Sequence, residues 1–190
     1  MCMALILRAF STLISQKMIT IIAGTNRQGS NTLKLANYCK AQIQKKGVAV
    51  DIISLTELPD NFIASDMYGK RSEAFQQIQD RITASDKFLF VIPEYNGGYP
   101  GILKAFIDAC TFPNSFSGKK AALIGLSAGK YGNIRGLEHF TGIAHYFNLY
   151  ILPLKLHIPM INTELDEHGN LIKENTLSFI DQQLEQLIAF

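Results

Sequence analysis

Cysteine is scarce in this sequence, which has only Cys2, Cys39 and Cys110 among its 190 residues. The spacing of the three fits neither a zinc site nor a disulfide framework. Cys39 and Cys110 fall within helical patterns, where a buried free thiol is the ordinary interpretation. The sequence therefore predicts a reducing, cytoplasmic compartment.

The sequence also lacks a strong charge bias and a long apolar run. Its 18 Lys and Arg residues and 16 Asp and Glu residues leave a formal net charge of +2, too small to indicate nucleic-acid binding. No stretch approaches the about 20 apolar residues of a membrane-spanning helix. We therefore expect neither nucleic acid nor a membrane as a partner.

Residues 1–17 differ from the rest of the chain. They are apolar, but Arg8 interrupts the apolar stretch and no small-residue cleavage site precedes Met18, which disfavours a signal peptide. We interpret them as an extension, either disordered or the product of a wrongly assigned start, with a targeting role as the alternative. Residues 18–190 then form a single domain, without internal repeats or linkers.

From residue 18 onward, short apolar runs alternate with longer amphipathic ones. The apolar runs predict strands at residues 18–23, 48–55, 87–93, 119–127 and 149–158. The amphipathic runs predict helices at residues 31–46, 72–85, 99–111, 133–147 and 174–188. Residues 56–71 are loop-like, and residues 162–171 form a polar turn. This alternation indicates a doubly wound α/β fold, in which helices cover both faces of a five-stranded parallel sheet in three layers.

Ligands of such sheets bind at the carboxyl ends of the strands. The loop after the first strand, "AGTNRQGSNT" at residues 23–32, precedes a predicted helix, and the free N–H groups of a helix N-terminus attract phosphate. Ser30 stands where a Walker loop requires lysine, and Asn26 stands where the dinucleotide motif requires glycine. The loop therefore suits a single terminal phosphate, with a capped helix start as the alternative.

The loops after the third and fourth strands are rich in glycine. In "PEYNGGYPGILKAFIDAC" (93–110), a turn at residues 96–98 would let a flat ligand lie against peptide groups, and Tyr95 and Tyr99 could cover a ring or be ordinary surface residues. In "GLSAGKYGNIRGLEHF" (125–140), four glycines accompany Ser127, Tyr131 and Arg135. In the predicted fold all three loops meet at one edge of the sheet, which favours one shared ligand site.

The same three loops carry a resemblance to a known family. "GTNRQGSNT" resembles the G-S-x-R-x-x-S loop of the flavodoxin-like, NADPH-dependent FMN reductase family, which includes azobenzene, quinone and chromate reductases; Thr25 replaces the usual serine and Ser30 comes one residue late. "PEYNGGYPGILKAFID" resembles the P-E-Y-N-x-S-x-P-x-x-L-K-N-x-I-D signature, with Gly98 and Ala105 as departures. "SAGKYGNIRG" resembles its third loop, S-x-G-x-x-G-x-R. The resemblance covers residues 18 to about 188.

The resemblance implies the flavodoxin-like strand order 2-1-3-4-5 and a set of site residues. The FMN phosphate would be held by Thr25, Arg27, Ser30, Asn31 and Thr32. The flavin ring would be lined by Pro93, Glu94, Tyr95, Asn96 and Gly97. The far wall would be formed by Ser127, Gly129 and Gly132. Tyr99 and Arg135 would contact the substrate.

The implied activity is the transfer of hydride from NADPH or NADH through FMN to a quinone, azo compound, free flavin or metal oxyanion. The flavin carries the chemistry, so no catalytic side chain is expected, and the backbone at Asn96, Gly97 and Gly98 would lie near the ring. The four histidines have no metal-ligand spacing, so no metal is expected. A homodimer or homotetramer is implied. A flavodoxin-type electron carrier and a non-catalytic flavin-binding module remain alternatives, although such carriers are usually strongly acidic.

Overall fold

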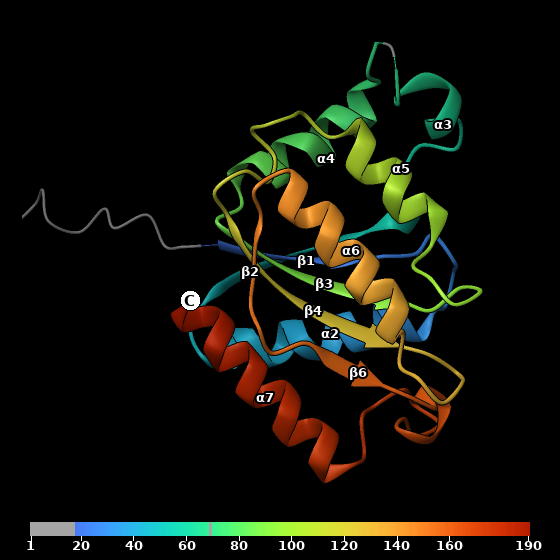
Figure 1. The fold of residues 1–190 in the computed structure, drawn as a ribbon, viewed down its shortest axis with the longest axis vertical. Helices are drawn as coiled ribbons and strands as arrows, with labels where there is room; N and C mark the ends of the chain where they lie inside the picture. The colour runs from blue at the N-terminus through green and yellow to red at the C-terminus, as the bar shows by residue number, and fades with distance from the viewer. Residues whose placement is uncertain (1–17, 69) are drawn as a thin grey trace, which may run out of the picture.

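A computed structural model describes residues 18–68 and 70–190, so the interpretation of residues 1–17 and of Cys2 lies outside the described residues. A parallel sheet forms the centre of the molecule (Figure 1). Its strands are β1 (Met18–Ala23), β2 (Ala49–Ser54), β3 (Lys87–Pro93), β4 (Lys120–Leu126), β5 (Tyr150–Ile151) and β6 (Leu156–Ile158). The spatial order is β2-β1-β3-β4-β5, with β6 also paired to β4. The predicted fold class and strand order are confirmed.

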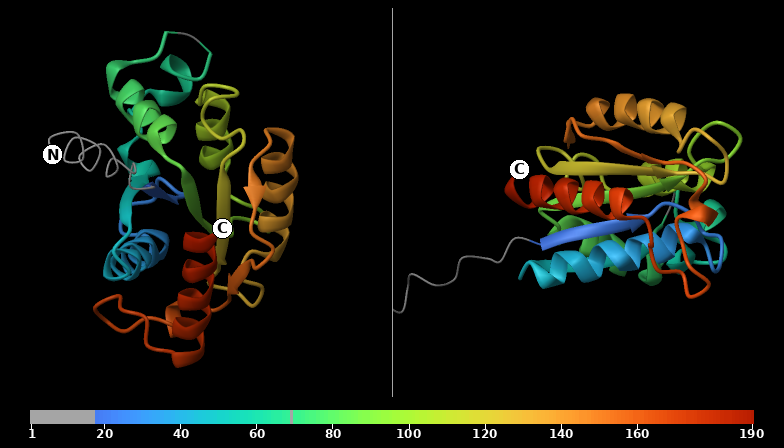
Figure 2. Two further views of the ribbon diagram at one scale, coloured as in Figure 1. Left: turned by 90° about the vertical axis from the view of Figure 1, so that its left-hand side faces the viewer. Right: turned by 90° about the horizontal axis from the view of Figure 1, so that it is seen from below.

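Helices cover both faces of the sheet, giving the three layers seen edge-on in Figure 2. One face is covered by α2 (Asn31–Lys45) and α7 (Glu174–Ala189), and the other by α4 (Glu73–Ala84), α5 (Gly101–Ala109) and α6 (Ile134–Tyr146). Each face has its own apolar core. Phe90 packs towards Phe140 of α6 on one face, while Leu89 belongs to the cluster of Leu35 and Leu184 on the other, because side chains alternate along a strand.

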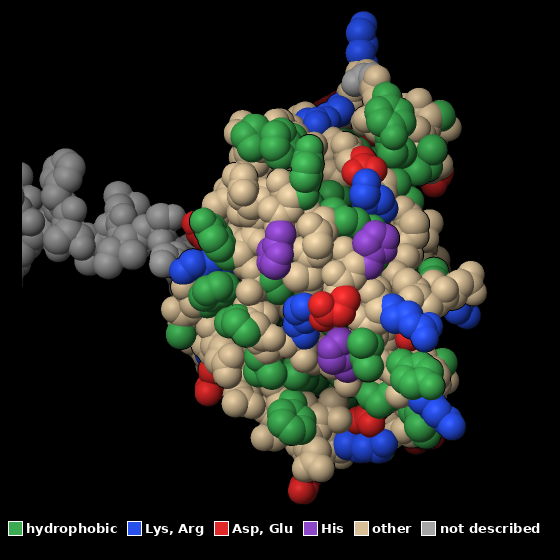
Figure 3. All heavy atoms as spheres, viewed as in Figure 1, with side chains coloured by type: hydrophobic (Ala, Val, Ile, Leu, Met, Phe, Trp, Pro, Cys, Tyr) green, Lys and Arg blue, Asp and Glu red, His purple; other side chains and the backbone are tan. Residues whose placement is uncertain are grey.

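The central strands are buried on both sides, as their continuous apolar runs predict. All seven residues of β3 are buried, and it pairs with β1 and with β4. The outer surface seen in Figure 3 mixes charges of both signs with hydrophobic side chains, in keeping with the small net charge. Among the described residues, no helix is long and apolar enough to cross a membrane.

Three segments differ from the sequence-based expectation. The single strand predicted at 149–158 is interrupted. Ile151 pairs with Ala121 and Leu156 pairs with Ile124, so four residues (152–155) lie between the two paired positions, whereas β4 has only two (122–123). Pro153, which has no N–H to donate, lies in this excursion. The helix predicted at 99–111 is shorter, since Pro100 is its N-cap. The 56–71 loop contains two short helices, η1 (Leu55–Glu57) and α3 (Phe62–Ser65).

Candidate functional site

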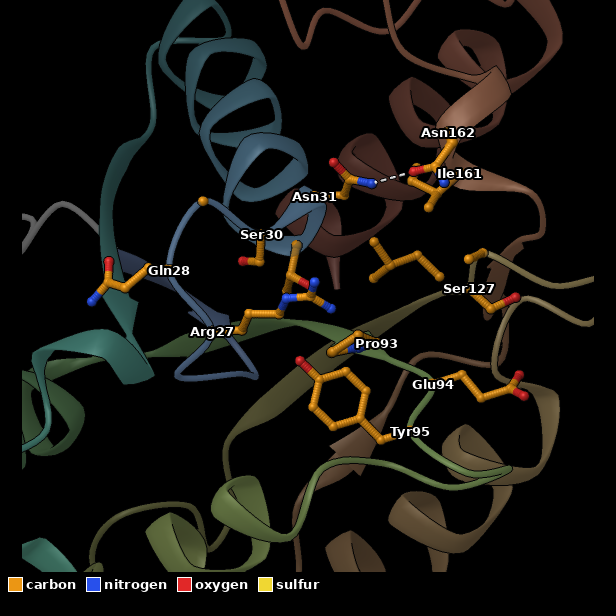
Figure 4. Close-up of a pocket in the computed structure, with 14 residues that line it drawn as sticks. Arg27, Gln28, Ser30, Asn31, Pro93, Glu94, Tyr95, Ser127, Ile161 and Asn162 are labelled. Atoms are coloured by element: carbon orange, nitrogen blue, oxygen red, sulfur yellow. Dashed lines mark hydrogen bonds between the residues drawn. The ribbon is translucent and has the colours of Figure 1, made fainter.

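A cavity of about 480 Å³ opens at the carboxyl edge of the sheet, beside the ends of β1, β3, β4 and β6 (Figure 4). It lies at the point where the strand order reverses, since the chain crosses from β1 to β2 on one side and to β3 on the other. Its lining residues are Arg27, Gln28, Gly29, Ser30, Asn31, Thr32, Pro93, Glu94, Tyr95, Leu126, Ser127, Ala128, Ile161 and Asn162. We call this space the main cavity.

The loop after β1 ends in a capped helix. Ser30 has extended backbone angles and its hydroxyl accepts the N–H of Leu33 at 3.2 Å, as an N-cap does. The cap interpretation left open by the sequence is therefore correct for Ser30. A cap and a phosphate site are compatible, because the N-terminus of a helix has up to four free N–H groups. Asn31 donates to Asn162 Oδ1 at 2.8 Å, which links this helix to the segment after β6.

Arg27 carries an uncompensated positive charge at the mouth of the main cavity. Its side chain is exposed and points towards the other lining residues, whereas the neighbouring Gln28 points away (Figure 4). Within residues 18–68 and 70–190, no carboxylate forms an ion pair with Arg27. A guanidinium presents a planar fork of donors that matches phosphate oxygens. Arg27 is therefore free to bind an anion.

The loop after β3 is a two-residue hairpin. The N–H of Tyr95 donates to Gly98 O at 2.8 Å, and the N–H of Gly98 donates to Tyr95 O at 3.1 Å. Asn96 and Gly97 have positive φ values of 51° and 79°, which is the type I′ turn that Asn-Gly favours. The Tyr95 hydroxyl lies 2.7 Å from the Thr25 hydroxyl, so the hairpin is tied to the loop after β1.

Ser127 holds the loop after β4 in shape. Its hydroxyl donates to Gly129 O at 2.9 Å and accepts the N–H of Gly132 at 2.9 Å. Gly132 itself has a φ of 56°, and a Cβ there would lie 2.7 Å from Ile158 N. The loop's own geometry thus requires Gly132, whereas a Cβ at Gly129 would meet nothing within 4 Å, and neither glycine lines the main cavity.

Asn133 joins the end of β3 to the start of α6. It is fully buried, has a φ of 64°, and donates from Nδ2 to Ile92 O at 3.0 Å and to Pro93 O at 3.1 Å. Its backbone N–H donates to Glu94 Oε2 at 3.0 Å. Gly136 leaves room for its amide, because a Cβ at position 136 would overlap Asn133 Oδ1. These contacts fix the wall formed by Pro93 and Glu94.

The predicted site residues other than Tyr99 fall into three groups. Eight of them line the main cavity: Arg27, Ser30, Asn31, Thr32, Pro93, Glu94, Tyr95 and Ser127. Thr25 is buried behind it and contacts Tyr95, while Asn96, Gly98, Gly129 and Gly132 shape the loops. Gly97 and Arg135 line a second cavity of about 220 Å³, together with Glu94, Tyr131 and Ile134.

Tyr99 lines neither cavity. Its ring packs against His139 at 5.1 Å between centroids and against Phe140 at 5.7 Å, and burial raises the pKa of its phenol. Substrate contact by Tyr99 thus has no support from its position. Six lining residues escaped the sequence reasoning: Gln28, Gly29, Leu126, Ala128, Ile161 and Asn162. The last two follow the final strand, so including every loop at the carboxyl edge would have found them.

Metal and thiol chemistry find no support in this region. No group of three or more His, Cys, Asp or Glu side chains in the described part of the chain could hold a metal ion. Cys39 and Cys110 are buried free thiols, and burial raises the pKa of each to about 12. Neither thiol lines the main cavity. The described lining of the main cavity therefore offers hydroxyl, amide and charged groups rather than a thiol.

The chain has an open parallel sheet of order 2-1-3-4-5, with a helix N-terminus and hydroxyl groups at the point where the strand order reverses. These features define the class of flavodoxin-like proteins. The particular family follows from comparison with known proteins. The family model "NADPH-dependent FMN reductase" matches residues 18–163, and the chain belongs to this family. The predicted family and class of activity, an FMN-dependent NAD(P)H oxidoreductase, are confirmed.

Three similar proteins illustrate the relationship. A 2-hydroxy-1,4-benzoquinone reductase of Burkholderia sp is 25% identical over 90% of this chain and 94% of its own length. An NAD(P)H-dependent FMN reductase of Pseudomonas aeruginosa is 29% identical over 83% of this chain and 90% of its own. The solved flavoenzyme NAD(P)H:(acceptor) oxidoreductase FerB of Paracoccus denitrificans superposes with a TM-score of 0.74 at 25% identity, covering 91% of this chain and 96% of that one.

Proposed function

We propose that this chain holds FMN in the main cavity and reduces a small quinone at the expense of NADPH or NADH. The observation that carries the proposal is the convergence of four loops on one cavity at the switch point of the sheet. Several relatives are named quinone reductases, which supports a quinone as the acceptor, and others are named an FMN reductase and an FMN-dependent NADPH-azoreductase.

The residues at the start of α2 fit the phosphate of FMN. The loop before this helix and its first turn offer free N–H groups and partial positive charge. Ser30, Asn31 and Thr32 add hydroxyl and amide groups, and Arg27 adds a charge-assisted contact. Thr25 contributes indirectly, because its hydroxyl contacts that of Tyr95.

The hairpin after β3 fits the ring. Bound FMN would supply hydride acceptance from NAD(P)H and delivery of two electrons to the acceptor. Pro93, Glu94 and Tyr95 form a fixed wall, with Ser127 beside it at the end of the neighbouring strand β4. The N–H of Gly98 closes the hairpin and is not available to a ligand, which leaves the N–H groups of Asn96 and Gly97 to face developing negative charge.

An absorbance spectrum of the purified protein tests the proposal. We expect a flavin band, a rise in melting temperature when FMN is added to stripped protein, and bleaching on anaerobic addition of NADPH. Subsequent addition of a quinone should restore the band. A colourless protein whose melting temperature does not respond to FMN would contradict it.

Two alternatives make different predictions in this experiment. A flavodoxin-type carrier would bind FMN without bleaching by NAD(P)H, and the net charge of +2 speaks against it. A non-catalytic flavin-binding module would show the band but reduce no acceptor. Only the reductase gives continuous NAD(P)H oxidation with a quinone.

The proposal extends to assembly and compartment. An apolar groove between α5 and α6, about 370 Å³ in volume, is flanked by Phe112 and Tyr146, which are 68% and 84% exposed. Such a surface supports a homodimer or homotetramer. The two buried free thiols support a cytoplasmic location. Light scattering coupled to size exclusion tests the first, and fractionation of the source cells tests the second.

A further inference from the structure

The second cavity adjoins the main cavity, and Glu94 lines both. Its remaining lining residues are Gly97, Tyr131, Ile134 and Arg135. Its volume of about 220 Å³ is below the range of about 300–1,000 Å³ typical of sites for drug-sized ligands. The occupant is therefore small, and a molecule of one or two rings suits the space.

Two large side chains at the second cavity are exposed. Tyr131 is 64% exposed and Ile134 is 46% exposed, and they lie three residues apart at the start of α6. Aromatic and aliphatic groups around a small concavity favour a flat apolar ring, because ring contact removes both from water. The shape and the side chains thus point to a planar ligand.

Arg135 adds a positive charge that the described residues do not neutralise. Its guanidinium forms no ion pair there, and the neighbouring Glu138 is paired with Lys155 at 2.7 Å instead. A Cβ at Gly97 would lie 3.7 Å from Arg135 Nη1, so the guanidinium rests against the tip of the hairpin. The charge is therefore held beside the site proposed for the flavin ring.

Glu94 is the one carboxylate that lines the second cavity. Its Oε2 accepts the N–H of Asn133 at 3.0 Å, at the positive end of α6. Both the hydrogen bond and the helix terminus offset its negative charge. The carboxylate is thereby held at the boundary with the main cavity, while Arg135 keeps its donors free.

We infer that the second cavity binds a flat, anionic electron acceptor, namely a quinone bearing an ionised hydroxyl group. Arg135 would donate charge-assisted hydrogen bonds to the ionised oxygen, with Tyr131 and Ile134 against the ring. The inference rests on the proposed function, since it needs a reductase whose flavin lies in the main cavity. NAD(P)H supplies a hydride, that is two electrons and one proton, and water supplies the second proton, so that the quinone leaves as the hydroquinone while NAD(P)⁺ forms.

Kinetics with two acceptors of similar size test this inference. We would compare 2-hydroxy-1,4-benzoquinone, which is ionised at neutral pH, with the neutral 2-methyl-1,4-benzoquinone, using FMN-loaded protein and saturating NADPH. The ratio of the two kcat/KM values should fall by about tenfold in Arg135→Gln, as expected for a lost charge-assisted hydrogen bond. Arg135→Lys should restore part of it.

Lys130→Gln is the matched control. Lys130 is an exposed residue of the same loop and lines neither cavity, so its removal changes the net charge equally. The acceptor ratio should change by less than twofold in this variant, whereas an equal fall in both variants would reveal long-range steering and overturn the inference. If Arg135→Gln raised the KM for NADPH and left the acceptor ratio unchanged, Arg135 would bind a phosphate of the dinucleotide. That result would also overturn the inference.

Equilibrium dialysis separates this inference from the proposed function. Oxidised, FMN-loaded protein is dialysed against 2-hydroxy-1,4-benzoquinone without NAD(P)H, so that no turnover is needed. We expect binding that weakens about tenfold in Arg135→Gln. Binding without any quinone reduction would sink the proposed function alone, whereas equal binding by wild type and Arg135→Gln would sink the inference alone.

Discussion

The two walls of the main cavity differ in whether they leave a charged side chain without a partner. In the loops after β3 and β4, the polar groups contact one another: Ser127 bridges Gly129 and Gly132, and Asn133 binds Ile92, Pro93 and Glu94. In the loop after β1, Thr25, Ser30 and Asn31 also contact protein groups, but the side chain of Arg27 makes no hydrogen bond or ion pair with the described residues. We therefore regard the first wall as a frame and the second as the part that binds.

The largest expected effect is a loss of stability when the frame is changed at Gly136. A Cβ at Gly136 would overlap Asn133 Oδ1 and lie 2.8 Å from Tyr99 N. Gly136→Ala should lower the free energy of unfolding by about 3 kcal/mol, the upper end for overpacking, although alanine is normally the better helix residue. Urea denaturation of the FMN-free protein measures it.

Gly142→Ala in the same helix is the matched control. Nothing lies within 4 Å of a Cβ at that position. This variant should raise the free energy of unfolding by about 0.5–1 kcal/mol. If both variants shift stability in the same direction, the space at Gly136 is not reserved for Asn133.

The next effect concerns the binding wall. Arg27→Ala should weaken FMN binding by about 1.5–3 kcal/mol, because a hydrogen bond to a charged group is lost. The stability of the FMN-free protein should change by less than about 0.5 kcal/mol, since Arg27 is exposed and unpaired among the described residues. Fluorescence titration with FMN measures the first quantity. Lys34→Ala, an exposed cation of α2 outside the cavity, controls for net charge, and unchanged FMN affinity in Arg27→Ala would remove Arg27 from the site.

Asn133→Gly, in contrast to Arg27→Ala, should act mainly on the stability of the FMN-free protein. Glycine keeps the φ of 64° but leaves the carbonyls of Ile92 and Pro93 without their donor. The buried Oδ1 of Asn133 has no donor of its own, so its removal offsets part of the cost. We expect a loss of about 1–2 kcal/mol of stability in urea denaturation without FMN.

Asn148 offers the comparison for that variant. It also has a positive φ, 59°, but its side chain is exposed. Asn148→Gly should therefore change the free energy of unfolding by less than about 0.5 kcal/mol. Equal losses in the two variants would show that the backbone conformation, rather than the buried amide, stabilises the frame.

The frame and the binding wall also differ in how well sequence predicts them. The strands and the three loops at the carboxyl edge of the sheet were predictable, because apolar periodicity and turn residues are local signals. The roles of Asn133 and Gly136 were not, since they depend on a contact between β3 and α6 that no local pattern records. The interruption at Pro153 shows the same limit, because an edge strand tolerates an excursion that a central strand would not.

The binding residues also divide into those that local sequence signals indicate and those that depend on long-range contacts. Arg27 and Ser30 could be found from the type and spacing of residues before a helix. Asn162 lies in the loop after the final strand, which the rule on carboxyl ends also covers, but its contact with Asn31 depends on where the chain turns after β6. The substrate contact of Tyr99 stays a prediction: this residue lies close to Tyr95 in sequence, but its ring packs on α6.

The smallest expected effect separates the two roles of Ser30, which caps α2 and also lines the main cavity. Ser30→Ala should lower the free energy of unfolding by about 1 kcal/mol, and Ser30→Gly by only a few tenths, because glycine is itself an acceptable N-cap. If the hydroxyl also contacts the FMN phosphate, both variants should lose FMN affinity equally, by about 0.5–1.5 kcal/mol. Should FMN affinity instead follow stability, falling in the alanine variant alone, Ser30 would act only through the helix start, and the phosphate contact would belong to Arg27 and the backbone N–H groups.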